Sequence, residues 1–101
     1  MFLNKVIMTG IVHNQPELRH TKSSIAVTNF IIKTGEILHK IVCWSIIAEK
    51  AVETLRKGNL IYLEGEIGYQ KKNEVISMEI KASDIMVIAS TLDESTEITV
   101  P

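Results

Sequence analysis

Apolar residues gather in five stretches of the chain, and polar or turn-forming residues separate them. The stretches are rich in Val, Ile, Leu and Phe and cover residues 3–12, 25–34, 36–45, 59–70 and 74–88. Such composition, bounded by turn residues, predicts five β-strands. Pro16 lacks a backbone donor and has a fixed φ, so residues 13–20 are expected to form a turn or an edge segment. Gly35 and the sequence KKN at 71–73 mark the expected tight turns.

The apolar period changes after the third strand. Four apolar residues stand at i, i+3, i+4 and i+7, the spacing of one face of an α-helix: Ala48, Ala51, Val52 and Leu55. Ser45 is a suitable N-cap before them, and Gly58 is a suitable residue just past the helix end. This pattern predicts a short helix between the third and fourth strands.

Five strands with one helix at this place predict an all-β fold, a five-stranded OB barrel with one short helix between strands 3 and 4. Gly10, Gly65 and Gly68 lie inside the strands, where they allow bends. A small β-sandwich is the alternative, although a single helix is less expected there. We expect residues 1–88 to form this one domain, and residues 89–101 to form a short, acidic, mobile tail.

The single tryptophan lies on the more polar face of the third strand. Because side chains alternate along a strand, Lys40 and Trp44 share one face while Ile41 and Cys43 share the other. The pattern alone favours an aromatic residue of the core or of an interface, and it leaves open why the single indole shares a face with a lysine.

Composition narrows the class of protein. With 101 residues, 46% apolar and 23% charged, the chain suits one globular domain. The net charge of −1 is unevenly spread: residues 1–88 hold all 11 basic and 9 of the 12 acidic residues, a net of +2. Cys43 is the single cysteine, which excludes an internal disulfide and fits a reducing compartment. With no membrane-length apolar run and no signal-peptide pattern at the start, we expect a cytoplasmic protein.

No catalytic or metal-binding pattern stands out. The sequence lacks a Gly-rich phosphate loop, H-E-x-x-H and G-x-S-x-G. The histidines and Cys43 lack the paired spacing of a zinc site. Glu64 and Glu66 share a strand face, but we assign them no catalytic role. We therefore expect neither an enzyme nor a bound cofactor, metal or small-molecule substrate.

Four motifs, in order, resemble bacterial single-stranded DNA-binding proteins. The start LNKVIMTGIVHNQPELRHT is similar to that family's opening pattern, and IAVTNFIIKT is similar to its A-V-A-N-F strand. HKIVCW and LRKGNLIYLEGEI resemble two further segments, so the likeness covers about residues 3–88. It implies an OB-fold oligomer, a dimer or a tetramer, that binds single-stranded DNA with little sequence preference.

The resemblance implies roles for particular residues. Trp44 falls on a stacking position and His39 on a position near a subunit interface. The residues expected to bind nucleic acid are Lys5, Lys40, Trp44, Arg56, Lys57, Tyr69, Lys71 and Lys72. For each of these a structural role stays open: an aromatic residue in the core or at a barrel edge, a cation on a solvated strand or turn, or a cation at a helix end.

The chain also departs from the family's pattern. Leu38 stands where a stacking tryptophan is typical, and the acidic, phenylalanine-ended C-terminal tip that recruits other enzymes is missing. We expect protection of single strands in replication, recombination or repair, at the nucleoid, with replication or repair proteins as further partners. The alternatives are a primosome-accessory OB protein that recruits a helicase, and an OB module that binds only proteins.

Overall fold

The computed structural model describes residues 1–90. Within them the chain forms one helix and six strands. These elements are β1 (Val6–Val12), β2 (Arg19–His20), β3 (Ala26–Thr34), β4 (Ile37–Trp44), α1 (Ser45–Thr54), β5 (Leu60–Lys72) and β6 (Val75–Ala89). The tail expected at residues 89–101 lies outside the described residues from residue 91 onward.

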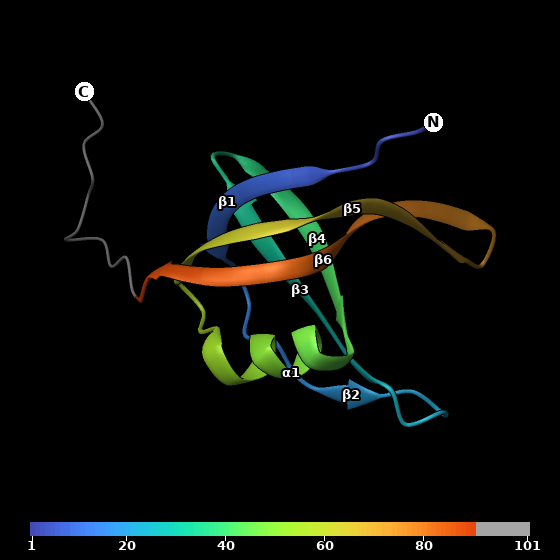
Figure 1. The fold of residues 1–101 in the computed structure, drawn as a ribbon, viewed down its shortest axis with the longest axis horizontal. Coiled ribbons are helices and arrows are strands. Elements are labelled where there is room, and N and C mark those ends of the chain that lie inside the picture. The colour runs from blue at the N-terminus through green and yellow to red at the C-terminus, as the bar shows by residue number, and fades with distance from the viewer. Residues whose placement is uncertain (91–101) are drawn as a thin grey trace.

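The strands form one curved sheet that closes on itself (Figure 1). Their order is β1-β5-β6-β4-β3-β2, and β1 also pairs with β3 at Ile11 and Val12, which closes the ring. β4 and β6 are parallel where they meet, and every other pairing is antiparallel. The five long strands with α1 after the third of them confirm the expected OB barrel, and β2 adds a two-residue edge to β3.

The helix lies across one end of the barrel (Figure 1). Ala48, Ala51 and Leu55 are fully buried there and Val52 is half-buried, so three of the four expected residues form the apolar stripe. Two details of the expected helix are wrong. Ser45 is its first residue, with φ of 55°, and no side chain caps the N-terminus. The helix ends at Thr54, four residues before Gly58, because Leu55 turns to an extended backbone.

Two glycines allow the barrel to close. At Gly10 a Cβ would lie 2.9 Å from the Thr34 hydroxyl and 3.0 Å from the Lys33 carbonyl oxygen, so β1 can approach β3 only without a side chain. At Gly65 a Cβ would collide with the Lys81 carbonyl oxygen, and the β5–β6 register shifts at this point. The strand therefore bends sharply between Glu64 and Gly65.

Beyond the barrel, β5 and β6 continue as a two-stranded arm (Figure 1). Its turn is formed by Asn73 and Glu74, both with positive φ. The turn expected at residues 71–73 is therefore displaced, and Lys71 and Lys72 are the last residues of β5. This displacement changes which residues of the two strands face each other.

Candidate nucleic-acid interface

The outward side of β4 carries the tryptophan. Ile41 and Cys43 point into the core and are fully buried, whereas Lys40 is exposed and Trp44 is 38% exposed. The alternation expected from the sequence is confirmed. Val42, which lies between Lys40 and Trp44 on the outward side, is only 4% exposed.

Trp44 borders a surface hollow of about 530 Å³, which we call the Trp44 hollow. The residues lining it come from β4, α1, β5, β6 and the segment before β1; they include Leu3, Lys5, Trp44, Ile47, Glu66 and Lys81. Two lysines thus share the hollow with an exposed aromatic ring. Neither of the two ion pairs found among residues 1–90 involves Lys5, Lys40 or Lys81, so their ammonium groups are available for phosphates.

Asn4 fixes the segment that carries Lys5. Its Nδ2 donates to the Ile67 carbonyl oxygen at 2.8 Å, and its Oδ1 accepts from the Ile67 N–H at 2.9 Å. A side chain that satisfies both backbone groups of one residue substitutes for a pairing strand. Lys5 is therefore held beside β5, at the edge of the Trp44 hollow.

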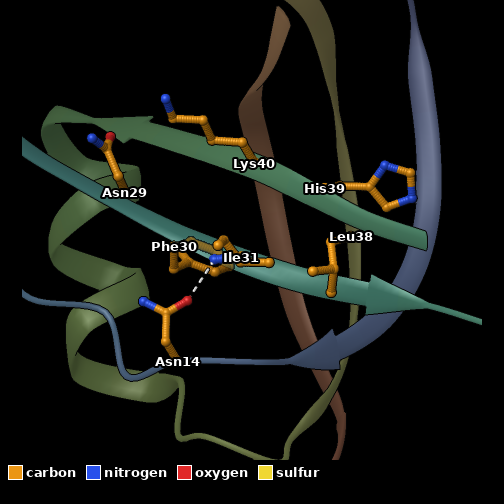
Figure 2. Close-up of a pocket in the computed structure, with 7 residues that line it drawn as sticks. All are labelled: Asn14, Asn29, Phe30, Ile31, Leu38, His39 and Lys40. Carbon is orange, nitrogen blue, oxygen red and sulfur yellow. Dashed lines mark hydrogen bonds between the residues drawn. The ribbon is translucent and has the colours of Figure 1, made fainter. Parts of the chain in front are cut away.

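Lys40 belongs to a second hollow, of about 330 Å³, on the β3–β4 hairpin (Figure 2). We call it the Leu38 hollow; it is lined by Asn14, Asn29, Phe30, Ile31, Leu38, His39 and Lys40. Asn14 anchors one rim, because its Oδ1 accepts from the Ile31 N–H at 2.8 Å. Trp44 lies four positions after Lys40, about 13 Å along a strand. The cations nearest the indole in the hollow are thus Lys5 and Lys81.

His39 has the opposite orientation to its neighbours. It pairs with the buried Ile32, in the third pair from the turn of the hairpin, and is itself half-buried. His39 therefore lies on the core side of the sheet, and it also contributes to the lining of the Leu38 hollow.

The residues expected to bind nucleic acid near the tip of the arm lie on two different sides of it. Tyr69 pairs with Met78 and Lys71 with Ile76, on the side that continues the barrel interior through Ile67 and Ile80. Lys72 pairs with Val75 on the opposite side, which continues outward to Lys81. Tyr69 is 72% exposed, so it is free to stack, but it lies on the other side of the ribbon from the Trp44 hollow.

Arg56 and Lys57 lie far from the tryptophan. They follow the C-terminus of α1, whereas Trp44 precedes its N-terminus, and ten helical residues span about 15 Å. The Arg56 guanidinium donates to the carbonyl oxygens of Val52 and Leu55. This is the contact expected of a cation that caps a helix end.

The outward side of β1, β5 and β6 exposes mainly apolar side chains. We call it the apolar face; it is formed by Ile7, Thr9, Tyr62, Glu64, Asp84, Met86 and Ile88. Ile7, Met86 and Ile88 are 59%, 57% and 53% exposed. The Tyr62 hydroxyl donates to Glu64 at 2.7 Å, and this hydrogen bond raises the pKa of Tyr62. Lys50 pairs with Asp84 at 3.5 Å.

Neither a reactive thiol nor a metal site accompanies the two hollows. Burial raises the pKa of the Cys43 thiol to about 12, which keeps it protonated and unreactive. Among residues 1–90 no group of three or more His, Cys, Asp or Glu residues could hold a metal ion. In the same part of the chain no helix is long and apolar enough to cross a membrane.

Comparison with known proteins assigns the chain to a family. The model of the single-strand binding protein family matches residues 3–93. The chain belongs to this family. The match includes every residue of both hollows and of the arm.

Curated relatives agree with the assignment, and a solved structure shares the fold. The chain is 35% identical over 99 residues to a single-stranded DNA-binding protein of Neisseria meningitidis, covering 85% of this chain and 57% of the relative. It is 30% identical over 97 residues to one of Xanthomonas campestris, covering 83% and 56%. The chain thus spans about half the length of the curated relatives it matches. The crystal structure of the SSB domain of a Synechococcus protein is similar in fold, with a TM-score of 0.73, 20% identity, and 84% and 96% coverage.

The sequence interpretation missed Lys81. Alternation in the fifth predicted strand already turns Lys81 outward between the buried Ile80 and Ala82. Its position opposite Glu66 follows only from the register, which pairs residues on either side of the Asn73–Glu74 turn. With the turn placed at residues 71–73 that register could not be found.

Proposed function

We propose that this chain binds single-stranded DNA without strong sequence preference, by stacking a base on Trp44 and neutralising phosphates with lysines. The observation that carries the proposal is the Trp44 hollow, where an exposed indole shares the lining with Lys5 and Lys81. Stacking tolerates every base because every base has a π-face, and lysines follow the backbone. Membership of the family and the names of the relatives support the same function.

The other residues expected to bind nucleic acid differ in how directly they would contact the DNA. Lys40 extends the path toward the Leu38 hollow, where aliphatic contacts replace a stacking ring. Lys72 lies on the outward side of the arm, in line with Lys81, so it can follow the same strand of DNA. Tyr69 and Lys71 serve a strand that passes over the arm to its other side. We assign Arg56 a structural role at the helix end, and Lys57 the weakest contact.

The experiment is a titration of Trp44 fluorescence with oligo-dT at two salt concentrations, with a duplex of equal length as the control. Single strands should quench the indole, and quenching should weaken as salt rises because counterions are released on binding. Fluorescence anisotropy of a labelled oligonucleotide gives an independent measure of binding. Binding without quenching would place DNA away from Trp44, and absence of binding by both measures would refute the function.

Assembly of identical chains is part of the proposal. The apolar face leaves three large aliphatic side chains more than half exposed, which is typical of a surface that another molecule covers. We propose that a second copy covers it, and that His39 supports an assembly contact. Met86→Lys should lower the mass measured by light scattering toward that of one chain. Lys57→Gln, remote from this face, is the control and should leave the mass unchanged.

We further propose that the chain protects single strands at the nucleoid during replication, recombination or repair, in contact with proteins of those processes. A primosome-accessory role is the rival. Pull-down of a replicative helicase by the chain without DNA would favour the rival. Binding of oligo-dT without any retained helicase would favour protection.

A further inference from the structure

One acidic side chain lines the Trp44 hollow. We propose that Glu66 reads the base that stacks at Trp44, favouring bases with an exocyclic amino group, such as cytosine, over thymine and uracil. The inference rests on the proposed binding of single-stranded DNA and deepens it. It assigns a base-composition preference to one position of an otherwise sequence-tolerant surface.

The strand register sets the distance between Glu66 and Trp44. Glu66 pairs with Lys81, and Lys81 pairs with Val42, two residues before Trp44 on the same side of β4. With strands about 4.8 Å apart and about 3.3 Å of rise per residue, the Cα atoms of Glu66 and Trp44 are about 12 Å apart. Both side chains line the hollow, and a span of about 12 Å between their Cα atoms leaves room for one base between them.

The backbone of Glu66 is held on both sides. Gly65, before it, is packed so closely on the Lys81 carbonyl that it tolerates no Cβ. Ile67, after it, has both backbone groups bound by the side chain of Asn4. These contacts fix the backbone at Glu66, and the strand register therefore keeps its side chain on the side of β5 that faces the hollow.

The charge of Glu66 gives the preference its direction. Neither ion pair found among residues 1–90 involves Glu66, so no lysine of that part neutralises it through a direct contact. An ionised carboxylate can only accept hydrogen bonds. It matches the amino group of cytosine, as glutamate does when it reads cytosine in duplexes. Thymine and uracil present carbonyl oxygens there, which the carboxylate repels.

The test compares oligo-dC, oligo-dT and oligo-dU of one length at pH 8, by fluorescence anisotropy, for the wild type and Glu66→Gln. The amide removes the charge and can also donate to a carbonyl. The substitution should therefore strengthen binding of dT and dU more than that of dC. We expect the dC-to-dT affinity ratio to fall about three- to tenfold. Oligo-dU should follow oligo-dT, which excludes the thymine methyl group as the cause.

Glu79→Gln is the matched control. Glu79 lies on the same side of β6, two residues from Lys81, and does not line the hollow. It should change the affinity for dC and dT by the same factor, through charge alone. An unchanged ratio in Glu66→Gln, with binding retained, would overturn the inference and leave the proposed function standing. Absence of binding to all three oligonucleotides by the wild type would overturn both.

Discussion

The apolar face and the face that carries Trp44 use the same two strands, β5 and β6, and they differ in where their charged side chains find partners. Lys5, Lys40 and Lys81 make no ion pair within residues 1–90. On the apolar face Glu64 accepts from Tyr62 and Asp84 pairs with Lys50. The face that carries Trp44 thus has lysines without ion-pair partners in residues 1–90. The apolar face has exposed aliphatic side chains, and Glu64 and Asp84 on it are bound by other side chains.

This difference shows why net charge is a poor guide to the proposed function. A chain of net charge −1 would not be expected to bind a polyanion. Binding depends on the local field, which is set by the few charges that line a groove. Among residues 1–90, Glu66 is the one acidic side chain that lines the Trp44 hollow, where Lys5 and Lys81 are also found.

The largest expected effect is a loss of stability when the bend of β5 between the two faces is changed. At Gly65, β5 bends from the apolar face to the Trp44 hollow, and a Cβ would meet backbone atoms that cannot move aside. Gly65→Ala should lower the free energy of unfolding by about 2–4 kcal/mol. Urea denaturation measures this change.

Gly68→Ala is the control for Gly65→Ala. Its Cβ would lie 4.0 Å from the nearest neighbour, the Glu79 carbonyl oxygen, which is ordinary contact. The substitution should change the free energy of unfolding by less than about 0.5 kcal/mol. Equal losses in the two variants would show that the bend at Gly65 does not depend on the missing side chain.

The second prediction compares the aromatic residues of the two faces. Trp44→Ala should weaken binding of oligo-dT by about 1–3 kcal/mol, or roughly five- to 150-fold, because one stacking surface is lost. Trp44→Phe keeps a ring and should lose much less. Tyr62→Phe, on the apolar face, should leave the affinity unchanged. If Trp44→Ala bound as tightly as the wild type in anisotropy, the indole would not be a stacking surface.

The sequence predicted those features that depend on neighbours along the chain. The alternation in β4 correctly turned Trp44 and Lys40 outward, and the helical spacing correctly buried Ala48, Ala51 and Leu55. It also placed the helix between the right strands, which is what identifies the barrel. These features follow from local periodicity, which needs no knowledge of the partner strand.

Features that depend on register could not be predicted. Lys81 lies opposite Glu66 in the Trp44 hollow, and this pairing is counted from a turn at residues 73–74, not at the expected residues 71–73. The same register places Tyr69 and Lys72 on opposite sides of the arm. A one-residue slip in register moves every side chain to the other face, so a small error in a turn has large consequences for a site.

The third prediction compares free and paired lysines. For single strands each neutralised phosphate contributes about 0.7 to the slope of log affinity against log salt. The double variant Lys5→Gln, Lys81→Gln should therefore reduce that slope by about 1.4. Lys50→Gln removes a lysine that is bound to Asp84 and to the Ile85 carbonyl oxygen, so its slope should equal that of the wild type. Titrations at four or more salt concentrations decide between these outcomes.

The smallest expected effect concerns the two groups with raised pKa values. Burial raises the pKa of Cys43 from 9.0 to about 12, and a hydrogen bond to Glu64 raises that of Tyr62 above 10.0. When the folded state has the higher pKa, the unfolded chain loses its proton first as pH rises. Each group therefore stabilises the fold fully below its unfolded pKa, and this contribution is lost as pH rises through the folded value.

For Cys43 the loss begins near pH 9 and should be below about 1 kcal/mol at pH 9.5. Urea denaturation of the wild type and of Cys43→Ala at pH 7.5 and 9.5 isolates it, because the variant lacks the thiol. The stability of the wild type should fall slightly more than that of Cys43→Ala between these pH values. Equal falls in the two proteins would mean that the thiol ionises as readily in the folded barrel as in the unfolded chain, so that β4 would not shield its inward side from water.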